Sequence, residues 1–251
     1  PDITEKAAGI GLMALDNVDD FSQYKVTVYS VTFGMDEGHG VERIVEAEAP
    51  LVPETENGAT LLNTYGKTFG HIGTCINPAQ LRDKKTLEKV KAQYNSVTLE
   101  NDMKPDFILN NWSPTFISVE DAKALGYVIP ENYTESKVPK LNLSTTDSVL
   151  KICAENGLGL RGHTLVWHAQ TPTWFFREDY QSNGNWVTPD VMDARLEFYV
   201  RSVMGHVYDN EYGHVVYSWD VVNEYVHAEN SGWEAVYGNE GLTPGFVKKA
   251  F

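Results

Sequence analysis

The stretch HVVYSWDVVNE, from His214 to Glu224, decides the fold. It is a near-continuous apolar run, which is typical of a strand covered on both faces in a parallel α/β sheet. The run ends in a polar pair, Asn223 and Glu224. In α/β barrels the catalytic groups lie at the carboxyl ends of the strands. We therefore predict that Glu224 transfers a proton and that earlier strands complete its site.

Strands and helices alternate from Phe69 onward. Strands are expected at 69–76, 95–101, 158–168 and 214–224, and helices at 77–94, 144–156, 191–210 and from 245. The first helix should bury Leu81, Leu87, Val90 and Tyr94, and STTD at 144–147 supplies a Ser/Thr cap. A further short helix is expected at 118–125, inside a long excursion from 102 to 143. This alternation indicates βαβ units and a parallel sheet.

The first part of the chain has a different pattern. Residues 9–33 alternate between polar and apolar, as in an antiparallel hairpin, so we assign 1–34 to a short β segment. Residues 35–67 are rich in acidic residues and proline, and we assign them to a linker. The α/β domain is then expected at 68–251.

Composition excludes several function classes. The 251 residues carry a net charge of −15, which argues against nucleic acid as a partner. No apolar run is long enough to cross a membrane, so no membrane partner is expected. Cys75 and Cys153 lie in apolar segments and are predicted to be buried free thiols.

Three of the predicted strands end in functional-looking groups. They are Glu100, Asn101 and Lys104, then His163, Trp167 and Gln170, then Asn223 and Glu224. Because the carboxyl ends of parallel strands meet at one edge, these groups should form one site. They combine hydrogen-bonding groups for sugar hydroxyls, flat apolar faces for pyranose rings and carboxyls for acid–base chemistry. Glycoside hydrolysis needs two such carboxyls.

The two histidines of the third strand raise a metal hypothesis, which we reject. His163 and His168 are five residues apart, so alternation points them to opposite faces, and no H-x-H or HExxH pattern is present. No metal or cofactor is expected. His168 is predicted to be a buried, hydrogen-bonded histidine, whereas His163, Leu165 and Trp167 should share the face that looks into the barrel.

The strand that ends in Asn223 and Glu224 poses a geometric problem. Strict alternation would aim neighbouring side chains to opposite sides, so joint action requires the backbone to leave the pleat there. Of the tryptophans, Trp219 is predicted to be core. Trp174 and Trp233 could form either sugar-stacking walls or core.

Three segments in this order resemble the glycoside hydrolase family 10 endo-β-1,4-xylanases: NSVTLENDMKPD, GLGLRGHTLVWHAQTPTWFF and YSWDVVNE. The resemblance covers Phe69 to Phe251 and implies a (β/α)8 barrel that hydrolyses xylan with retention. It implies that Glu224 is the acid/base and that Asn223 contacts the sugar 2-hydroxyl. It assigns Glu100, Asn101 and Lys104 to the sugars on the non-reducing side, and His163, Trp167 and Gln170 to the site wall.

Two departures from that pattern matter. The excursion at 102–143 is longer than usual, and the family's nucleophile segment, a TELDI-like stretch, is absent. We count about the first four βα units of a barrel that needs about 250 residues. The expected partners are therefore xylan or xylo-oligosaccharides and the C-terminal half of the barrel. That half belongs to the same gene or to a second chain, unless the gene is truncated or half-barrels associate.

Three functions stay open at this point. The chain is the N-terminal half of a retaining xylanase, a non-catalytic xylan-binding fragment, or an inverting glycosidase that uses Glu100 with Glu224. Residues 1–34 are a candidate end of a carbohydrate-binding β-sandwich. The resemblance implies an extracellular enzyme, although PDITEKAAGIGL lacks the features of a signal peptide.

Overall fold

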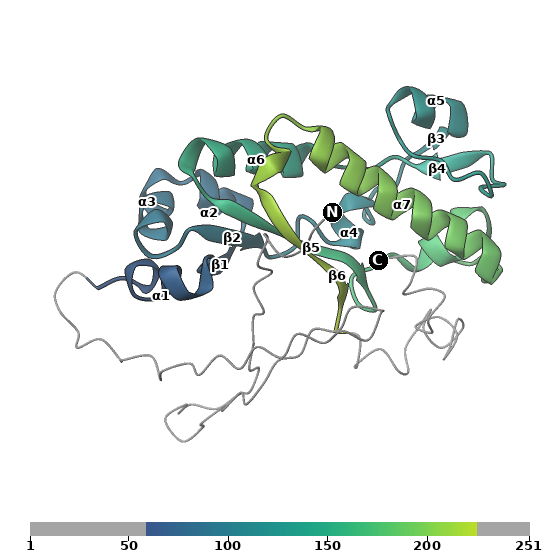
Figure 1. The fold of residues 1–251 in the computed structure, drawn as a ribbon. Coiled ribbons are helices and arrows are strands. Elements are labelled where there is room, and N and C mark those ends of the chain that lie inside the picture. Colours follow the sequence, from purple (N-terminus) through teal and green to yellow (C-terminus); the bar gives the residue numbers. More distant parts are fainter. Residues whose placement is uncertain (1–58, 225–251) are drawn as a thin grey trace, which may run out of the picture. The chain divides into compact units, whose positions relative to one another are not determined.

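The computed structural model describes residues 59–224, drawn in colour in Figure 1. Contacts divide the chain into two compact units, Pro1–Ala59 and Thr60–Phe251. The predicted β segment at 1–34, Trp233 and the helix from 245 lie outside the described residues. Within the described part, no helix is long and apolar enough to cross a membrane.

Four parallel strands form the sheet, in the order β1-β2-β5-β6. They are β1 (Gly73–Ile76), β2 (Ser96–Leu99), β5 (Gly159–Trp167) and β6 (Val216–Asn223). Helices connect them: α2 (Pro78–Arg82) and α3 (Lys84–Gln93) join β1 to β2, α6 (Ser144–Asn156) precedes β5, and α7 (Pro189–Asp209) precedes β6. In Figure 1, α6 and α7 lie along the same side of β5 and β6. The predicted βαβ alternation and parallel sheet are confirmed.

The boundary of the α/β unit differs from the prediction. Helix α1 (Leu61–Phe69) is capped by Thr60, whose side chain accepts from Asn63 N at 3.0 Å. It occupies the last residues of the expected linker and the first of the expected strand. The linker assignment is therefore wrong for 60–67, and the first strand begins only at Gly73.

The expected helix at 77–94 is two helices. Asp83 has an extended backbone (φ −75°, ψ 113°), and its carboxylate accepts from Thr86 N at 2.8 Å to cap α3. A residue that hydrogen-bonds the next turn with its side chain ends one helix and starts another. The predicted buried side is nonetheless correct, because Leu81 and Val90 are buried and Leu87 and Tyr94 pack against them.

Helix α6 begins without the predicted cap. Its N-cap is Leu143, which makes no side-chain cap bond. Asp147 turns instead to α7, where it accepts from Asn210 Nδ2 at 3.0 Å and lies 2.7 Å from His206 Nε2. The helix ends as predicted at Gly157, which has a left-handed φ of 66°.

The excursion between β2 and α6 carries structure that sequence periodicity did not indicate. It contains α4 (Pro105–Ile108) and an antiparallel pair, β3 (Phe116–Ser118) with β4 (Lys137–Pro139). The expected short helix is α5 (Val119–Ala124), capped by Ser118. In Figure 1, β3, β4 and α5 lie at one end of α7.

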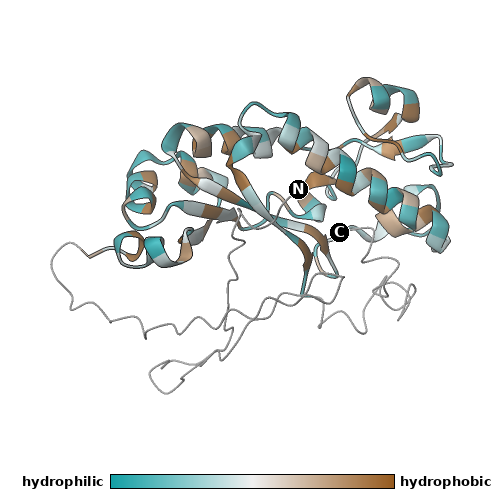
Figure 2. Cartoon of the chain, viewed as in Figure 1, coloured by the Kyte–Doolittle hydropathy of each residue, from teal (hydrophilic) through white to brown (hydrophobic). Residues whose placement is uncertain are grey.

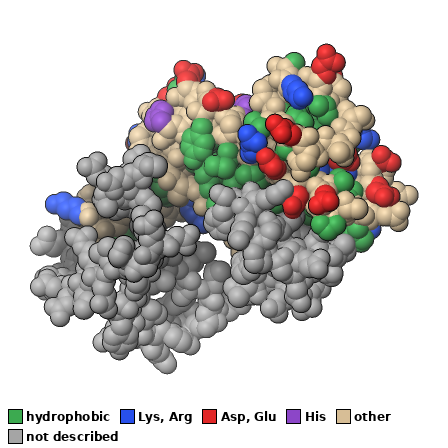
Figure 3. Space-filling view, turned by 45° about the vertical axis from the view of Figure 1, so that its right-hand side comes forward, with side chains coloured by type: hydrophobic (Ala, Val, Ile, Leu, Met, Phe, Trp, Pro, Cys, Tyr) green, Lys and Arg blue, Asp and Glu red, His purple; other side chains and the backbone are tan. Residues whose placement is uncertain are grey.

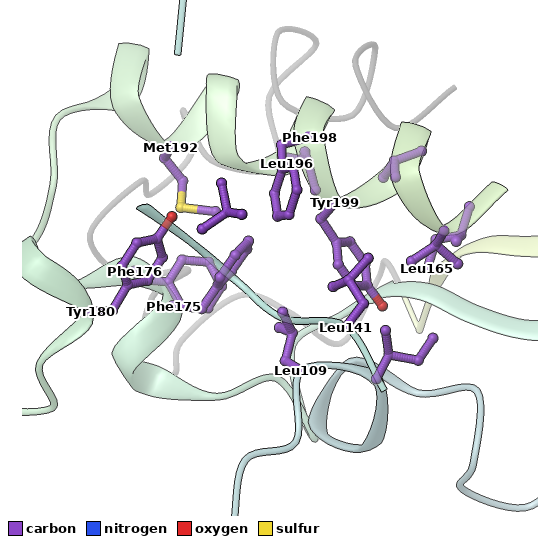
Figure 4. Packing of buried hydrophobic residues seen from close by; sticks show 14 of the residues in the cluster. Leu109, Leu141, Leu165, Phe175, Phe176, Tyr180, Met192, Leu196, Phe198 and Tyr199 are labelled. Carbon is purple, nitrogen blue, oxygen red and sulfur yellow. The ribbon is translucent and has the colours of Figure 1, made fainter. Parts of the chain in front are cut away.

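Two hydrophobic clusters form between the strands and the helices. Figure 4 shows the first, in which Leu196, Phe198 and Tyr199 of α7 pack toward residues of the excursion and the β5 end. The second includes Val97, Leu150, Cys153 and Leu160, between the sheet and α6. Figure 2 shows hydrophobic residues alternating with hydrophilic ones along α7, as expected for a helix with one buried side.

The two cysteines differ in environment. Cys153 is a buried free thiol, and burial raises its pKa to about 12. Cys75 is also free but is exposed on β1, so its predicted burial is wrong. β1 is an edge strand of the described sheet, and an edge strand has a neighbour on one side only.

Figure 3 shows acidic side chains at several places on one face, in keeping with the net charge of −15.

A buried arginine ties the excursion to α7. Arg195 is fully buried; its Nε donates to Glu135 Oε2 at 2.6 Å and its Nη2 to Oε1 at 2.5 Å. Its Nη1 donates to the carbonyls of Phe175 (2.5 Å) and Arg177 (3.0 Å), just beyond the end of β5. The guanidinium also lies 3.8 Å from the ring centroid of Tyr180. One charge thus holds α7, the excursion and the loop after β5 together.

Arg195→Met should lower the free energy of unfolding by about 3 kcal/mol, because Glu135 would keep a largely buried charge with no partner. Urea denaturation measures this change. Arg201→Met, on the same helix, is the control, because Arg201 is 56% exposed in its ion pair with Glu197. Its expected cost is below about 1 kcal/mol. Equal costs for the two variants would contradict the assigned role of Arg195.

Two glycines should respond to alanine with opposite signs. A Cβ on Gly162 would lie 2.3 Å from Cε3 of the Trp219 indole, whereas one on Gly205, in α7, would meet nothing within 4 Å. Gly162→Ala should cost about 1 to 3 kcal/mol through overpacking. Gly205→Ala should raise stability by up to about 1 kcal/mol through helix propensity. Thermal unfolding of both variants checks the pair, and a stable Gly162→Ala would refute the close contact.

Candidate active site

The predicted site residues lie at or directly after the ends of three parallel strands, except His163, which lies inside β5. Glu100 and Asn101 come directly after β2, and Lys104 is the N-cap residue of α4. Trp167 ends β5, and Gln170 follows with a positive φ of 45°. Asn223 ends β6. The parallel pairing of β2, β5 and β6 therefore places these groups at one edge of the sheet.

Lys104 contacts the residues of one part of the site. Its Nζ donates to Gln170 Oε1 at 2.8 Å and to Asn101 Oδ1 at 3.2 Å, and Gln170 Nε2 donates to the same Asn101 oxygen. The Lys104 Nζ also lies 4.8 Å from the centroid of the Trp167 ring, a cation–π distance. Burial lowers the pKa of Lys104, while the charges of Cys75, Glu224 and Glu100 act in the opposite direction. Four residues predicted from sequence thus form one cluster.

Glu224 lies at the centre of the other part of the site. Its Oε2 accepts from the indole N–H of Trp167 at 2.8 Å and lies 3.7 Å from His168 Nε2. Its side chain is 38% exposed. The Asn223 amide lies between Asp220 and Trp167; in the orientation that gives both its atoms a partner, its nitrogen donates to Asp220 Oδ2 at 3.0 Å and its oxygen accepts from Trp167 Nε1 at 3.2 Å. Asn223 and Glu224 therefore share one neighbour, Trp167.

This shared neighbour requires the backbone to leave the pleat, as predicted. β6 ends at Asn223, and Glu224 has a φ of 51°, in the left-handed region that side chains other than glycine seldom adopt. Neighbouring side chains can therefore lie on the same side. A residue held in this region near a site is a common feature of functional positions.

Asp220 is a site residue that the sequence analysis missed. Its Oδ2 lies 2.9 Å from His163 Nδ1 and 3.3 Å from Arg161 Nη2. Burial would raise the pKa of Asp220, but the His163 hydrogen bond and the Arg161 charge outweigh it and lower the pKa. The available signal was a single carboxylate inside the apolar run of β6. His163 and Asp220 are register partners in the β5–β6 pair.

Two interpretations of the third strand are wrong. Leu165 does not share the site face with His163 and Trp167, because it is buried in the cluster under α7. The β5–β6 register shifts between His163 and Val166, and the shift breaks the alternation. His168 is not a satisfied core histidine: its Nε2 faces Glu224, and its buried Nδ1 has no partner among the described residues.

The structure shows which of the described tryptophans are buried in the core and which lies at the strand ends. Trp174 is 5% exposed, and its N–H donates to Asn111 Oδ1 at 3.0 Å, so it is core and not a sugar-stacking wall. Trp219 is partly buried against both clusters, and its N–H donates to Tyr208 at 3.0 Å. Of the predicted flat faces, Trp167 is the one at the strand ends that contacts Glu224.

The arrangement suits proton transfer beside a polar binding surface. One partly exposed carboxyl is held by an indole N–H, and a lysine–amide cluster lies on the other side of the same indole. Residues 59–224 contain no group of three or more His, Cys, Asp or Glu side chains that could hold a metal. Glu100 is exposed beyond β2, and its charge acts on Lys104 together with that of Glu224.

The sequence of the chain is similar to those of known proteins. The sequence model described as Glycosyl hydrolase family 10 matches residues 60–251. Endo-1,4-β-xylanase A of Butyrivibrio fibrisolvens is 55% identical over 191 residues, which are 76% of this chain and 46% of that protein. Endo-1,4-β-xylanase Y of Acetivibrio thermocellus is 31% identical over 77% of this chain and 17% of its own length.

Solved structures of xylanases are similar to this chain in fold. The CBM22-1–GH10 modules of a Clostridium thermocellum endo-1,4-β-D-xylanase 10B, complexed with xylohexaose, match with a TM-score of 0.56 and 30% identity. That match covers 76% of this chain and 36% of the other. The xylanase of Caldicellulosiruptor owensensis matches with a TM-score of 0.54, at 27% identity, over 76% and 48% of the two chains. The chain spans less than half the length of each of these relatives.

The Asp220 ion pairs should make stability depend on pH in one direction. A lowered folded-state pKa stabilises the fold above the unfolded pKa, and this contribution is lost as pH falls through the folded pKa. Asp220→Asn should therefore be clearly destabilised at pH 6, and the difference from wild type should shrink between about pH 5 and pH 2. Urea denaturation at stepped pH measures the difference.

Glu88→Gln is the control for this experiment. Glu88 is 73% exposed and pairs with Lys91 three residues away, so the variant should differ little from wild type at any pH. If the cost of Asp220→Asn stays constant on acidification, the Arg161 and His163 contacts do not stabilise the carboxylate.

Proposed function

Because the chain belongs to glycosyl hydrolase family 10, we propose that it forms the N-terminal half of a retaining endo-β-1,4-xylanase barrel, with Glu224 as general acid/base. The single observation that carries this proposal is the Glu224 carboxyl, partly exposed at the end of β6 and held by Trp167 Nε1 at 2.8 Å. The curated relatives that support it are named endo-1,4-β-xylanases.

The proposed mechanism uses Glu224 twice. As an acid, it protonates the oxygen of the leaving sugar while a second carboxylate attacks the anomeric carbon and the glycosidic bond breaks. As a base, it then takes a proton from the water that cleaves the glycosyl-enzyme bond. The Trp167 N–H fixes Oε2, so we assign the proton transfer to Oε1. We assign the nucleophile to the part of the relatives' barrel that this chain does not cover.

The remaining site residues would bind sugar. Lys104, Asn101 and Gln170 present donors and acceptors around the Trp167 ring, a combination that fits a pyranose face and its hydroxyls. Asn223 lies beside Glu224 and suits the sugar 2-hydroxyl next to the scissile bond. His163, tied to Asp220, would support the wall, and Glu100 would bind the sugars on the non-reducing side.

A second candidate function rests on this same cluster. The Lys104–Asn101–Gln170 network is complete within the described residues and needs no second carboxylate. A non-catalytic xylan-binding fragment is therefore the alternative. The inverting use of Glu100 with Glu224 ranks below both, because β2 and β6 are separated by β5 alone, so their ends do not face each other across a barrel mouth. An extracellular location and a role in xylan degradation remain predictions from the family resemblance.

Reducing-sugar release from xylan tests the proposal. The 251-residue chain is assayed alone and together with the C-terminal barrel half of the B. fibrisolvens relative. We expect activity only in the combination, and Glu224→Gln should reduce it by at least about 100-fold. An activated aryl xyloside should lose less in its first step, because its leaving group needs little protonation.

Glu211→Gln is the matched control, because Glu211 is an exposed glutamate outside the strand ends, just before β6. It should keep the activity of the wild-type combination. Equal losses on xylan and on the aryl xyloside would contradict the acid/base role of Glu224. Binding of xylan without turnover in either arrangement would favour the alternative function.

A further inference from the structure

Trp112 is a large exposed aromatic residue that the proposed mechanism does not use. It is 71% exposed, the largest exposed fraction among the large hydrophobic residues of the described range. Its ring contact is with Phe107, at 6.3 Å between centroids and an interplanar angle of 72°. This T-shaped contact packs the indole against Phe107, while most of the Trp112 surface stays exposed to solvent.

The turn that carries Trp112 is held by hydrogen bonds from several sides. Asn111 N donates to Asp106 O at 2.9 Å, and Asn111 Oδ1 accepts from the buried Trp174 at 3.0 Å. Asn110 has a φ of 51°, and its Nδ2 donates to Ser113 O at 2.7 Å. A constrained backbone limits the positions that Trp112 can take, which reduces the entropy cost of binding on its ring.

The same backbone connects Trp112 to the site. Lys104 caps the start of α4, and the four residues of that helix add only about 6 Å before the turn begins. Asp106 N donates to the carbonyl of Gln170 at 2.8 Å, so the turn and the Lys104–Gln170 cluster are joined by two consecutive backbone bonds. The turn that carries Trp112 is therefore tied to the Lys104–Gln170 cluster through Asp106, within the excursion that is longer than the family pattern.

We propose that Trp112, braced by Phe107, is a stacking platform for an additional pyranose ring of a β-1,4-linked xylan chain, beyond the ring held by the Lys104 cluster. This inference rests on the proposed function. The chemistry favours a sugar, because a flat apolar face bordered by Asn110, Asn111 and Ser113 matches the apolar face and hydroxyl rim of a pyranose. Trp112 is the only exposed large hydrophobic residue between 105 and 115, which is too small a patch for a stable protein interface.

Isothermal titration of the full 251-residue chain with xylo-oligosaccharides of increasing length tests the platform. Trp112→Ala should weaken xylohexaose binding by about fivefold, the loss expected for one aromatic stacking contact. Xylotriose, which fills the Lys104 cluster first, should bind both proteins equally. Trp112→Phe keeps a flat ring and should recover part of the lost affinity.

Phe69→Ala is the control, because Phe69 is 59% exposed at the end of α1 and away from the strand ends that carry the site. It should bind both oligosaccharides like wild type. Thermal unfolding should show equal midpoints for wild type and Trp112→Ala, because Trp112 is 71% exposed and contributes little buried surface.

The outcomes separate the two proposals. Equal xylohexaose affinity in wild type and Trp112→Ala would overturn the platform and leave the proposed function standing. A uniform loss for xylotriose and xylohexaose would also overturn it, because the effect would then lie in the inner cluster. If wild type binds neither, the platform is rejected, and hydrolysis by the Glu224 variants decides the proposed function separately.

Discussion

The parallel pairing of β5 with β6 is the interaction on which the site depends. It sets His163 beside Asp220 and Trp167 beside Asn223, so residues 56 or 57 positions apart in the sequence become neighbours. A parallel strand end leaves its side chains at one edge, where they can meet. The shift in register between His163 and Val166 then turns Leu165 into the core, while Trp167 meets Glu224.

Trp167 joins two chemical environments. Its N–H holds the Glu224 carboxyl, and its ring lies under the Lys104 ammonium. A change at either end would therefore reach the other through one rigid indole. In the proposed function the same side chain would support both proton transfer and sugar binding, because both groups of predicted site residues contact it.

Helix α7 holds the excursion in place through Arg195. Arg195 satisfies its buried charge with Glu135 and with the carbonyls of Phe175 and Arg177, so the excursion and the loop after β5 cannot separate without exposing an unpaired charge. Trp112 projects from a turn in this braced region.

The sequence by itself determined the alternation of strands and helices, the end of α6 at Gly157 and the identity of the polar residues at the strand ends. These follow from periodicity and local hydrogen bonding, which act within a few residues. Only the tertiary structure decided that Leu165 faces the core, that His168 faces Glu224, that Asp220 joins His163 and that Cys75 is exposed. Each of these depends on strand register or on partners far away in the chain, which no local pattern records.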